Sequence, residues 1–418
     1  MQKNIIKPAL PFLMSLVLLA TVIYFSSQKN VQANNNQQQP IDEAVKASAS
    51  IDSKKMNPTE MRAVWVPFMT LNMKGTDFSE QAFKDKFDNI IKTSKEHHMN
   101  TLIVHVRSHG DSMYKSSYFP WSHLITGEQG KAPAFDPLEY MIKATHESGM
   151  AFHAWINPLR IQVNNTPEQI SQSNLYYKYR SNEATSNFVA DWENDKYFNP
   201  AYPEIRKLII DGVIEVVKNY DVDGIHFDDY FYPTEDSKYD ETSYNDYIRS
   251  VSQTEKPLSL KEWRVANINS LISGVYCAIK SVNKDVVFGI SPQGNIKNDD
   301  TMCADIKTWS SKDGYLDYIC PQIYVNFENP VLPFAKAVDS WRNIVSNRNI
   351  KLYIGIGAYK AGSDVDDGTW KKSNDILMKQ IEYIRKANCD GFMFYSWEYL
   401  NSPQTQDEVA NVVKILHN

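Results

Sequence analysis

Hydrophobic residues follow two alternating patterns between about residues 62 and 400. Short apolar runs rich in β-branched and aromatic residues recur at 62–69, 101–107, 151–159, 224–231, 286–292, 318–324, 351–358 and 391–397. The stretches between these runs place apolar residues three and four positions apart, as at Ile205, Leu208, Ile209 and Val213, which is typical of amphipathic helices. Strands separated by helices pair in parallel, so eight such units predict an α/β fold, a closed (β/α)8 TIM barrel. An open doubly wound sheet is the competing architecture, but no GxGxxG turn follows the first strand.

Polar or aromatic residues follow almost every predicted strand, where a buried core would not select them. Because the carboxyl ends of barrel strands meet on one face, these residues predict a polar cleft there. Two long stretches, 161–200 and 234–260, follow the third and fourth strands, so we expect them to overhang the same face as loop insertions. The many aromatic residues of the first stretch could stack on sugar rings, but a small core of the loop itself is the favoured interpretation.

The segment 223–233, DGIHFDDYFYP, ends an apolar run with two adjacent carboxylates. Glycoside hydrolysis needs a protonated carboxyl for the leaving oxygen and a second group for the developing cation. In one arrangement, Asp228 or Asp229 is the acid, and a distant carboxylate, Glu398 or Asp111, is the nucleophile or base. In the other, both aspartates serve a substrate-assisted reaction, in which one is the acid and the other orients an N-acetyl group. We expect Asp228, which lies on the same side of the strand as His226, to be the more deeply placed acid.

The remaining cleft residues are of the types that bind sugars. A sugar offers an apolar face to an aromatic ring and a belt of hydroxyls to amides and carboxylates. Trp121 and Trp397 are assigned to the cleft, whereas Trp65 and Trp155 could belong to the cleft or the core. His226 is expected chiefly to orient its neighbours. The full set of predicted substrate-binding residues is Arg107, Asp111, Trp121, Asn157, Arg160, His226, Tyr230, Gln293, Gln322, Tyr324 and Trp397.

Charge and cysteine content exclude several other classes. The formal net charge of the 418 residues is -6, and no basic stripe is present, so a nucleic-acid partner has no electrostatic support. The four cysteines are widely spaced without a CxxC pair, and no histidines show HExxH spacing. We therefore predict neither a metal site nor a cofactor.

The N-terminus is typical of an exported protein. Lys3 and Lys7 precede an apolar stretch at 8–25, and the small-residue site Val31-Gln32-Ala33 follows it. This stretch is just long enough to span a bilayer, so a retained anchor is an alternative to a cleaved signal peptide. We expect residues 1–33 to be the signal or anchor, 34–58 a disordered linker and 59–418 the catalytic domain of a secreted or cell-surface protein.

Seven ordered blocks between Met61 and Leu400 resemble a bacterial family of exported (β/α)8 proteins, glycosyl-hydrolase-like family 10. The blocks are RAVWV at 62–66, the long segment 106–138, HAWINPLRI at 153–161, YFNPAYPEIR at 197–206, 223–233, FGISPQGN at 288–295 and DYICPQIYVNF at 317–327. The resemblance implies action on peptidoglycan glycan strands that lack stem peptides. It also implies cleft roles for Arg107, Asp111, Trp121, Asn157, Arg160, Asp228, Asp229, Gln322 and Tyr324.

The chain departs from the family pattern at two places in the groove. Ser108-His109 replaces a Pro-containing pair after Arg107, and SPQG stands where SPFG is common. Glu398 is not carried over from the family. The sequence thus predicts an extracytoplasmic glycosidase acting on an N-acetylhexosamine polymer. A non-catalytic glycan-binding protein on the same barrel is the alternative.

Overall fold

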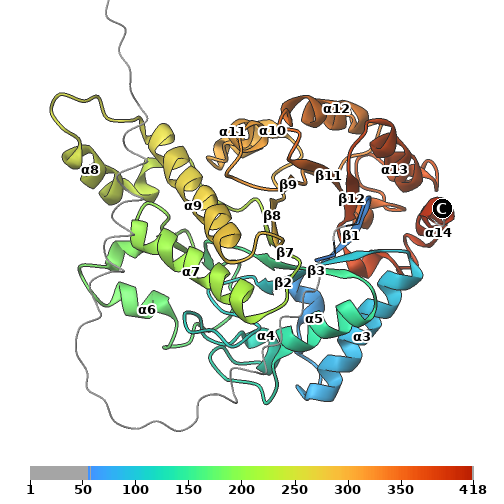
Figure 1. Ribbon diagram of the computed structural model, residues 1–418, viewed down its shortest axis with the longest axis horizontal. Coiled ribbons are helices and arrows are strands. Elements are labelled where there is room, and N and C mark those ends of the chain that lie inside the picture. Colours follow the sequence, from blue (N-terminus) through green and yellow to red (C-terminus); the bar gives the residue numbers. More distant parts are fainter. Residues whose placement is uncertain (1–54, 57, 417–418) are drawn as a thin grey trace, which may run out of the picture. The chain divides into compact units, whose positions relative to one another are not determined.

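The computed structural model describes residues 55–56 and 58–416, and its centre is a closed parallel barrel (Figure 1). Its strands, in chain order, are β1 (Met61–Val66), β2 (Thr101–Arg107), β3 (Ala151–Ile156), β7 (Gly224–Phe227), β8 (Val287–Ile290), β9 (Tyr318–Ile319), β10 (Gln322–Ile323), β11 (Lys351–Ile356) and β12 (Gly391–Phe394). β9 and β10 are one barrel strand interrupted at Pro321, which has no N–H for the ladder. Because β11 pairs with both pieces and β12 pairs with β1, the ring closes and the predicted (β/α)8 barrel is confirmed.

Helices surround the ring, as Figure 1 shows. The longer ones are α3 (Glu80–Glu96), α5 (Pro137–Glu147), α7 (Pro203–Asn219), α8 (Glu241–Ser250), α9 (Leu260–Val282), α12 (Phe334–Ile344), α13 (Ile376–Lys386) and α14 (Gln406–Leu416). The short ones are α2 (Phe68–Leu71), α4 (His123–Thr126), α6 (Leu175–Arg180), α10 (Ile296–Thr301) and α11 (Ile306–Ser311). Single turns of 3-10 helix are η1 (Ser186–Phe188), η2 (Ser237–Tyr239), η3 (Ala358–Lys360), η4 (Thr369–Lys371) and η5 (Trp397–Tyr399).

The core divides into an outer layer and a barrel interior. In the outer layer, the apolar face of each helix packs against the strands, as that of α7 does through Ile205, Ile209 and Val213. The interior is filled by the opposite strand faces, with Met61, Ala63, Trp65, Ile103, Trp155, Tyr318, Cys320, Tyr353 and Met393. This alternation decides which residues at each strand end point into the barrel mouth.

The two predicted insertions lie where expected in the chain. Residues 160–198 form a small antiparallel sheet, β4 (Arg160–Gln162), β6 (Asp195–Phe198) and β5 (Val189–Trp192), together with α6. The second insertion contains η2 and α8. The aromatic side chains of Tyr176, Tyr197 and Phe198 are buried, so the predicted loop core is confirmed for these three.

The predicted signal or anchor, 1–33, and almost all of the predicted linker, 34–58, lie outside the described residues. Lys55 and Met56 already contact the domain: Lys55 pairs with Asp221, and the Met56 backbone N–H donates to Asp223 at 2.9 Å. Within the part of the chain that the structure describes, no helix is long and apolar enough to cross a membrane.

Candidate active site

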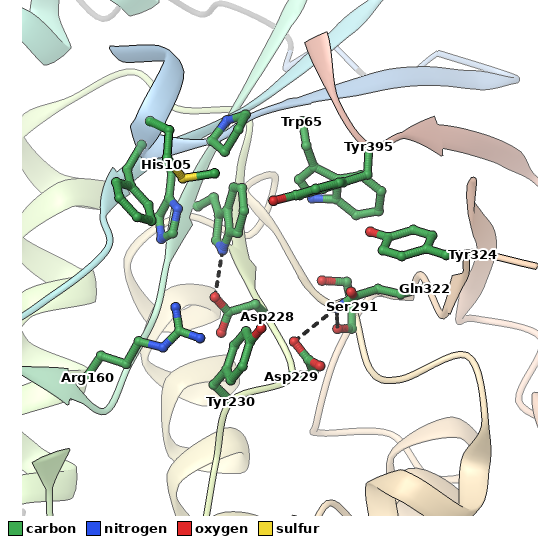
Figure 2. A pocket seen from close by; sticks show the side chains of 14 residues that line it. Trp65, His105, Arg160, Asp228, Asp229, Tyr230, Ser291, Gln322, Tyr324 and Tyr395 are labelled. Atoms are coloured by element: carbon green, nitrogen blue, oxygen red, sulfur yellow. Dashed lines mark hydrogen bonds between the residues drawn. The ribbon is translucent and has the colours of Figure 1, made fainter. Parts of the chain in front are cut away.

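The end of β7 places two carboxylates at the mouth of the barrel. Ile225 and Phe227 face the outer core, so His226 faces the interior, and Asp228 follows on its side. Asp229 lies just past the strand, where the backbone no longer alternates. Both aspartates are 2% exposed, and both line one pocket of about 200 Å³ (Figure 2).

Each aspartate accepts hydrogen bonds from neutral donors. Asp228 accepts from the Trp155 indole Nε1 at 3.1 Å and from Asn157 Nδ2 at 2.8 Å. Asp229 accepts from Gln322 Nε2 at 3.0 Å and from the amide of Gln293. All four donors favour the ionised carboxylates, but none of them carries a charge.

Burial shifts the two carboxyls toward their protonated forms. It raises the pKa of Asp228 to about 6, helped by the neighbouring Asp229, while Arg160, Asn157 and Trp155 act in the opposite direction. Burial also raises the pKa of Asp229, and the two glutamine amides oppose that rise. A carboxyl with a pKa near 6 can hold a proton close to neutral pH and release it to a leaving group.

Aromatic rings form the walls of this pocket. Trp65, Tyr324 and Tyr395 cluster on one side in Figure 2, where the Tyr395 ring centre lies 6.1 Å from Trp65 and 5.6 Å from Tyr324. Tyr230 is 46% exposed at the opposite rim, and the Arg160 guanidinium lies 3.5 Å from the centre of its ring. Flat apolar walls beside hydrogen-bonding groups are what a sugar ring needs.

His226 does not line the pocket but contacts Trp65, one of its aromatic walls. Its side chain is fully buried, and its Nε2 accepts from Trp65 Nε1 at 3.2 Å, since an indole nitrogen can only donate. Nδ1, 2.9 Å from the Tyr318 hydroxyl, therefore carries the proton of the neutral ring, and burial lowers the pKa of His226 well below 6.5. His226 is absent from the pocket lining, so the structure does not bring it to the substrate space, and its orienting role agrees with the geometry.

Asn157 and Gln293 are absent from the pocket lining, but each of them contacts one of the two aspartates. Asn157 is fully buried, and its Oδ1 accepts the backbone N–H groups of Leu159 and Arg160 while its Nδ2 holds Asp228. Gln293 holds Asp229. Both residues were predicted to bind substrate, and the structure shows each of them bound to one of the two carboxylates.

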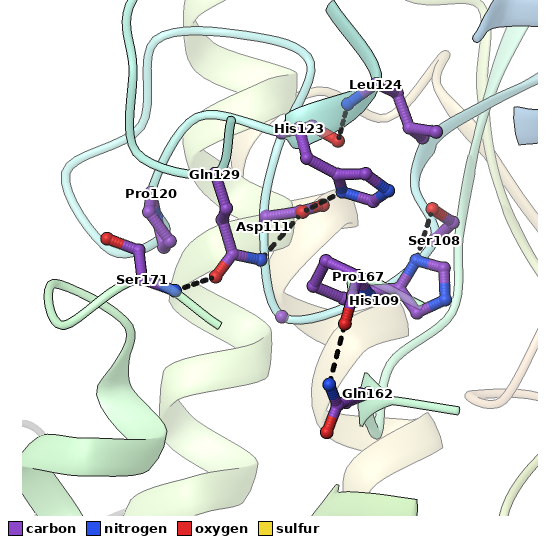
Figure 3. Close-up of polar contacts among 12 residues, drawn as sticks. Ser108, His109, Asp111, Pro120, His123, Leu124, Gln129, Gln162, Pro167 and Ser171 are labelled. Atoms are coloured by element: carbon purple, nitrogen blue, oxygen red, sulfur yellow. Dashed lines mark hydrogen bonds and ion pairs between the residues drawn. The ribbon is translucent and has the colours of Figure 1, made fainter. Parts of the chain in front are cut away.

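Arg107 and Asp111 lie away from the pocket. The pairing of β2 with β3 shifts register between His105 and Arg107, and the buried Arg107 guanidinium packs 4.2 Å from the Phe119 ring centre. Asp111 accepts from Gln129 Nε2 at 2.8 Å and pairs with His123 at 3.2 Å (Figure 3). Neither residue lines the pocket that holds the two aspartates, so substrate binding by Arg107 and Asp111 stays a prediction.

Three residues from the other predicted strand ends are also separate from the pocket. The Trp397 indole donates to the Ile90 carbonyl of α3 at 3.2 Å, because the turn η5 directs it outward. Glu398 is exposed and accepts from Ser396 Oγ at 2.5 Å and from Thr70. Trp121 is held by its backbone bridge to Ser112. The described lining of the aspartate pocket includes none of the three, so their assignment to the cleft stays a prediction.

Several lining residues were missed or left open by sequence reasoning. Trp65 and Trp155 do line the pocket, and so do Phe68, His105, Ser291 and Tyr395. Tyr395 follows the inward-facing Met393 by two residues, so strand alternation could have identified it. Of the predicted set, the structure brings Asp228, Asp229, Arg160, Tyr230, Gln322 and Tyr324 together around the pocket.

Comparisons with known proteins agree with this architecture. The model of the family described as glycosyl hydrolase-like 10 matches residues 60–372. The chain belongs to this family. The glycosyl hydrolase YngK of Bacillus subtilis (strain 168) is 34% identical over 82% of this chain and 69% of its own length. The glycosyl hydrolase DigH of Escherichia coli (strain K12) is 30% identical over 94% of both chains. The resemblance to glycosyl hydrolase-like family 10 is thus confirmed.

Solved structures resemble this glycosyl hydrolase-like 10 member in fold. The catalytic domain of β-amylase from Paenibacillus polymyxa aligns with a TM-score of 0.57 at 13% identity, covering 86% of this chain and 99% of that one. The PgaB (BpsB) glycoside hydrolase domain from Bordetella bronchiseptica aligns with a TM-score of 0.53 at 12% identity, covering 84% and 99%. At these identities the likeness shows the barrel fold alone.

Proposed function

We propose that this protein is an extracytoplasmic, endo-acting glycosidase that cleaves peptidoglycan glycan strands lacking stem peptides. Glycosidase activity follows from membership of the glycosyl hydrolase-like 10 family, whose relatives YngK and DigH are both named glycosyl hydrolases. The polymer, the location and the mechanism are our proposals. The observation that carries the proposed mechanism is a small aromatic pocket holding two adjacent carboxyls, one with its pKa raised to about 6.

Asp228 acts as the general acid in this proposal. Its proton passes to the glycosidic oxygen as the bond to the anomeric carbon breaks, and the leaving sugar departs with a new hydroxyl. The ionised Asp228 then takes a proton from the water that attacks the anomeric carbon. A group that alternates between these roles needs a pKa close to the working pH, which burial of Asp228 supplies.

Asp229 orients the substrate's own N-acetyl group in a substrate-assisted reaction. The acetamido oxygen attacks the anomeric carbon, and Asp229 accepts a hydrogen bond from the acetamido N–H and stabilises the positive charge of the cyclised intermediate. The distant-nucleophile alternative is weakened because Glu398 is exposed outside the pocket and Asp111 is enclosed in another network. Two successive displacements at the anomeric carbon should retain its configuration.

Reducing-end release tests the activity. Full-length protein incubated with purified, peptide-free glycan strands should generate new reducing ends at internal positions and shorten the strands. Tight binding without any release would leave a non-catalytic glycan-binding protein.

A thiazoline mimic of the cyclised intermediate tests the mechanism separately. Substrate-assisted catalysis predicts competitive inhibition, because the mimic matches the intermediate that Asp229 stabilises. If the enzyme were active but insensitive to the thiazoline, the nucleophile or base would have to be a carboxylate other than Asp228 and Asp229.

The proposed location depends on residues 1–33, outside the described part of the chain. Protease added to intact cells should degrade the catalytic domain if it is exported. Full protection in intact cells, lost on lysis, would contradict the export proposal.

A further inference from the structure

Arg160 presents a charged side chain to the pocket beside Asp228. It begins β4, directly after the turn that follows β3, and its backbone N–H donates to Asn157 Oδ1 at 2.9 Å. Its guanidinium covers the Tyr230 ring at 3.5 Å from the ring centre and points toward the space that Asp228 faces (Figure 2). The turn and the ring together hold the cation in one place.

The charge of Arg160 has no close carboxylate partner among the described residues. No Asp or Glu oxygen in this part of the chain lies within the 4.0 Å ion-pair distance of its guanidinium. The nearest acids, Asp228 and Asp229, accept their hydrogen bonds from uncharged indole and amide groups instead.

Arg264, another arginine of the same domain, has its charge neutralised by a carboxylate. Arg264 is 2% exposed, and it contacts both oxygens of the buried Asp240, with the shorter bond at 2.6 Å. The backbone carbonyls of Thr234 and Asp236 accept further hydrogen bonds from the Arg264 guanidinium. Arg160 stacks on the Tyr230 ring and also interacts with the Tyr230 hydroxyl, and Figure 2 shows its guanidinium directed into the pocket.

We infer that Arg160 binds a free carboxylate carried by the glycan. The planar guanidinium matches a carboxylate with two parallel hydrogen bonds. This inference rests on the proposed function and specifies its substrate class: an N-acetylhexosamine polymer with an ether-linked acidic side group. A neutral N-acetylhexosamine polymer would leave the guanidinium without its partner.

The inference explains selection for strands without stem peptides. In peptidoglycan, the lactyl group on alternate sugars ends in an amide while the stem peptide is attached, and in a free carboxylate after the peptide is removed. An amide carries no charge for Arg160 to pair with, and the attached peptide adds bulk beside the pocket. The substrate must therefore be supplied by a hydrolase that cleaves the lactyl amide bond.

The first experiment uses the unmodified full-length protein and two matched substrates. Peptide-free strands are compared with the same strands after their lactyl carboxyls have been reduced to alcohols. We expect kcat/KM for the carboxylated strands to be higher by roughly tenfold or more, because a charge-assisted bidentate contact is lost on reduction. Equal kcat/KM values for the two substrates would overturn the inference.

The second experiment locates the preference on Arg160. R160M removes the charge but keeps an unbranched stem, and R160K keeps the charge without the planar fork. The measured quantity is the ratio of kcat/KM between carboxylated and reduced strands. Arg160 also affects the pKa of the two aspartates, but that effect is the same for both substrates and cancels in the ratio. We expect R160M to abolish the preference and R160K to retain part of it.

A matched control separates the outcomes. Arg249 lies exposed on α8, where it pairs only with Asp246 three residues earlier, so R249M should keep the wild-type ratio. An R160M enzyme that still prefers carboxylated strands would overturn the assignment to Arg160. If the wild-type protein cleaved neither substrate, the proposed function would fail instead, so the two failures are distinguishable.

Discussion

Two buried carboxylates near the mouth of this barrel, Asp228 and Asp111, are in opposite electrostatic states. Asp228 has neutral donors and a pKa raised to about 6, and it faces an open pocket. Asp111 is fully buried between His123 and Gln129, and these partners lower its pKa despite the burial. Both follow predicted strands, and both were candidates for catalysis. A carboxyl exchanges a proton near neutral pH only when its surroundings disfavour the ionised form and so raise its pKa.

The network around Asp111 holds loops together instead. Gln129 donates to Asp111, and its Oε1 accepts the backbone N–H of Ser171 at 2.9 Å (Figure 3). Asp111 follows β2, whereas Ser171 belongs to the insertion after β4, so one amide connects two loops beside the barrel mouth. Asp228 is therefore placed for catalysis, whereas Asp111 holds loops together.

The largest expected effect is on turnover. Replacing Asp228 by Asn removes the transferable proton while keeping the shape, so kcat should fall by roughly 10² to 10⁴. The Asp111→Asn variant, measured on the same glycan at the same folded fraction, should stay within about tenfold of wild type, since the group touches no substrate. A comparable loss of kcat in the two variants would contradict the assignment of catalysis to Asp228 alone.

Stability should respond in the reverse order. Asp111→Asn weakens the buried contacts of this carboxylate with His123 and Gln129, which should cost about 1–3 kcal/mol of unfolding free energy in denaturant titrations at pH 7. Asp228→Asn should leave that free energy unchanged or raise it. An acid whose pKa is raised on folding loses stability as pH rises from its unfolded pKa through its folded one, and Asn removes this penalty. A strongly destabilised Asp228→Asn variant would contradict this reasoning.

A smaller effect should appear in the pH dependence. The free enzyme needs Asp228 protonated, so kcat/KM should decline as pH rises above about 6. Trp155→Phe deletes one donor that favours the ionised form, which should move this decline to higher pH. A decline that moved to lower pH, or did not move, would show that another group controls it.

The smallest effect is expected at Glu398. This residue is exposed outside the pocket, so Glu398→Gln should change kcat by less than about threefold. A loss as large as that of the Asp228 variant would restore the distant-nucleophile mechanism.

The sequence predicted the barrel well because its signals are periodic and repeated. Every predicted strand has a counterpart in the ring, but most of the counterparts end two to four residues earlier, as β7 does at Phe227. Residues just past a strand, such as Tyr230 and Phe231, share the aromatic character of strand residues, so composition alone extends the run.

The candidate site was predictable only in part, because side-chain direction depends on local backbone geometry. Asp228 follows its strand without a shift and reaches the pocket. Arg107 follows a register shift, and Trp397 begins a helical turn, so both point elsewhere. Neither irregularity has a signal in a single sequence. The raised pKa of Asp228 also depends on its surroundings in the fold, where Trp155 and Asn157 come from another strand region of the chain.

The most direct test of this contrast is the titration of the two carboxyls themselves. Carbon-13 labelling of aspartate carboxyls, followed by NMR across the pH range, should show one resonance with a pKa near 6 that is absent from the Asp228→Asn variant. The resonance lost in Asp111→Asn should instead titrate below the ordinary aspartate range. A resonance near pH 6 that survived in Asp228→Asn and vanished in Asp111→Asn would contradict the account.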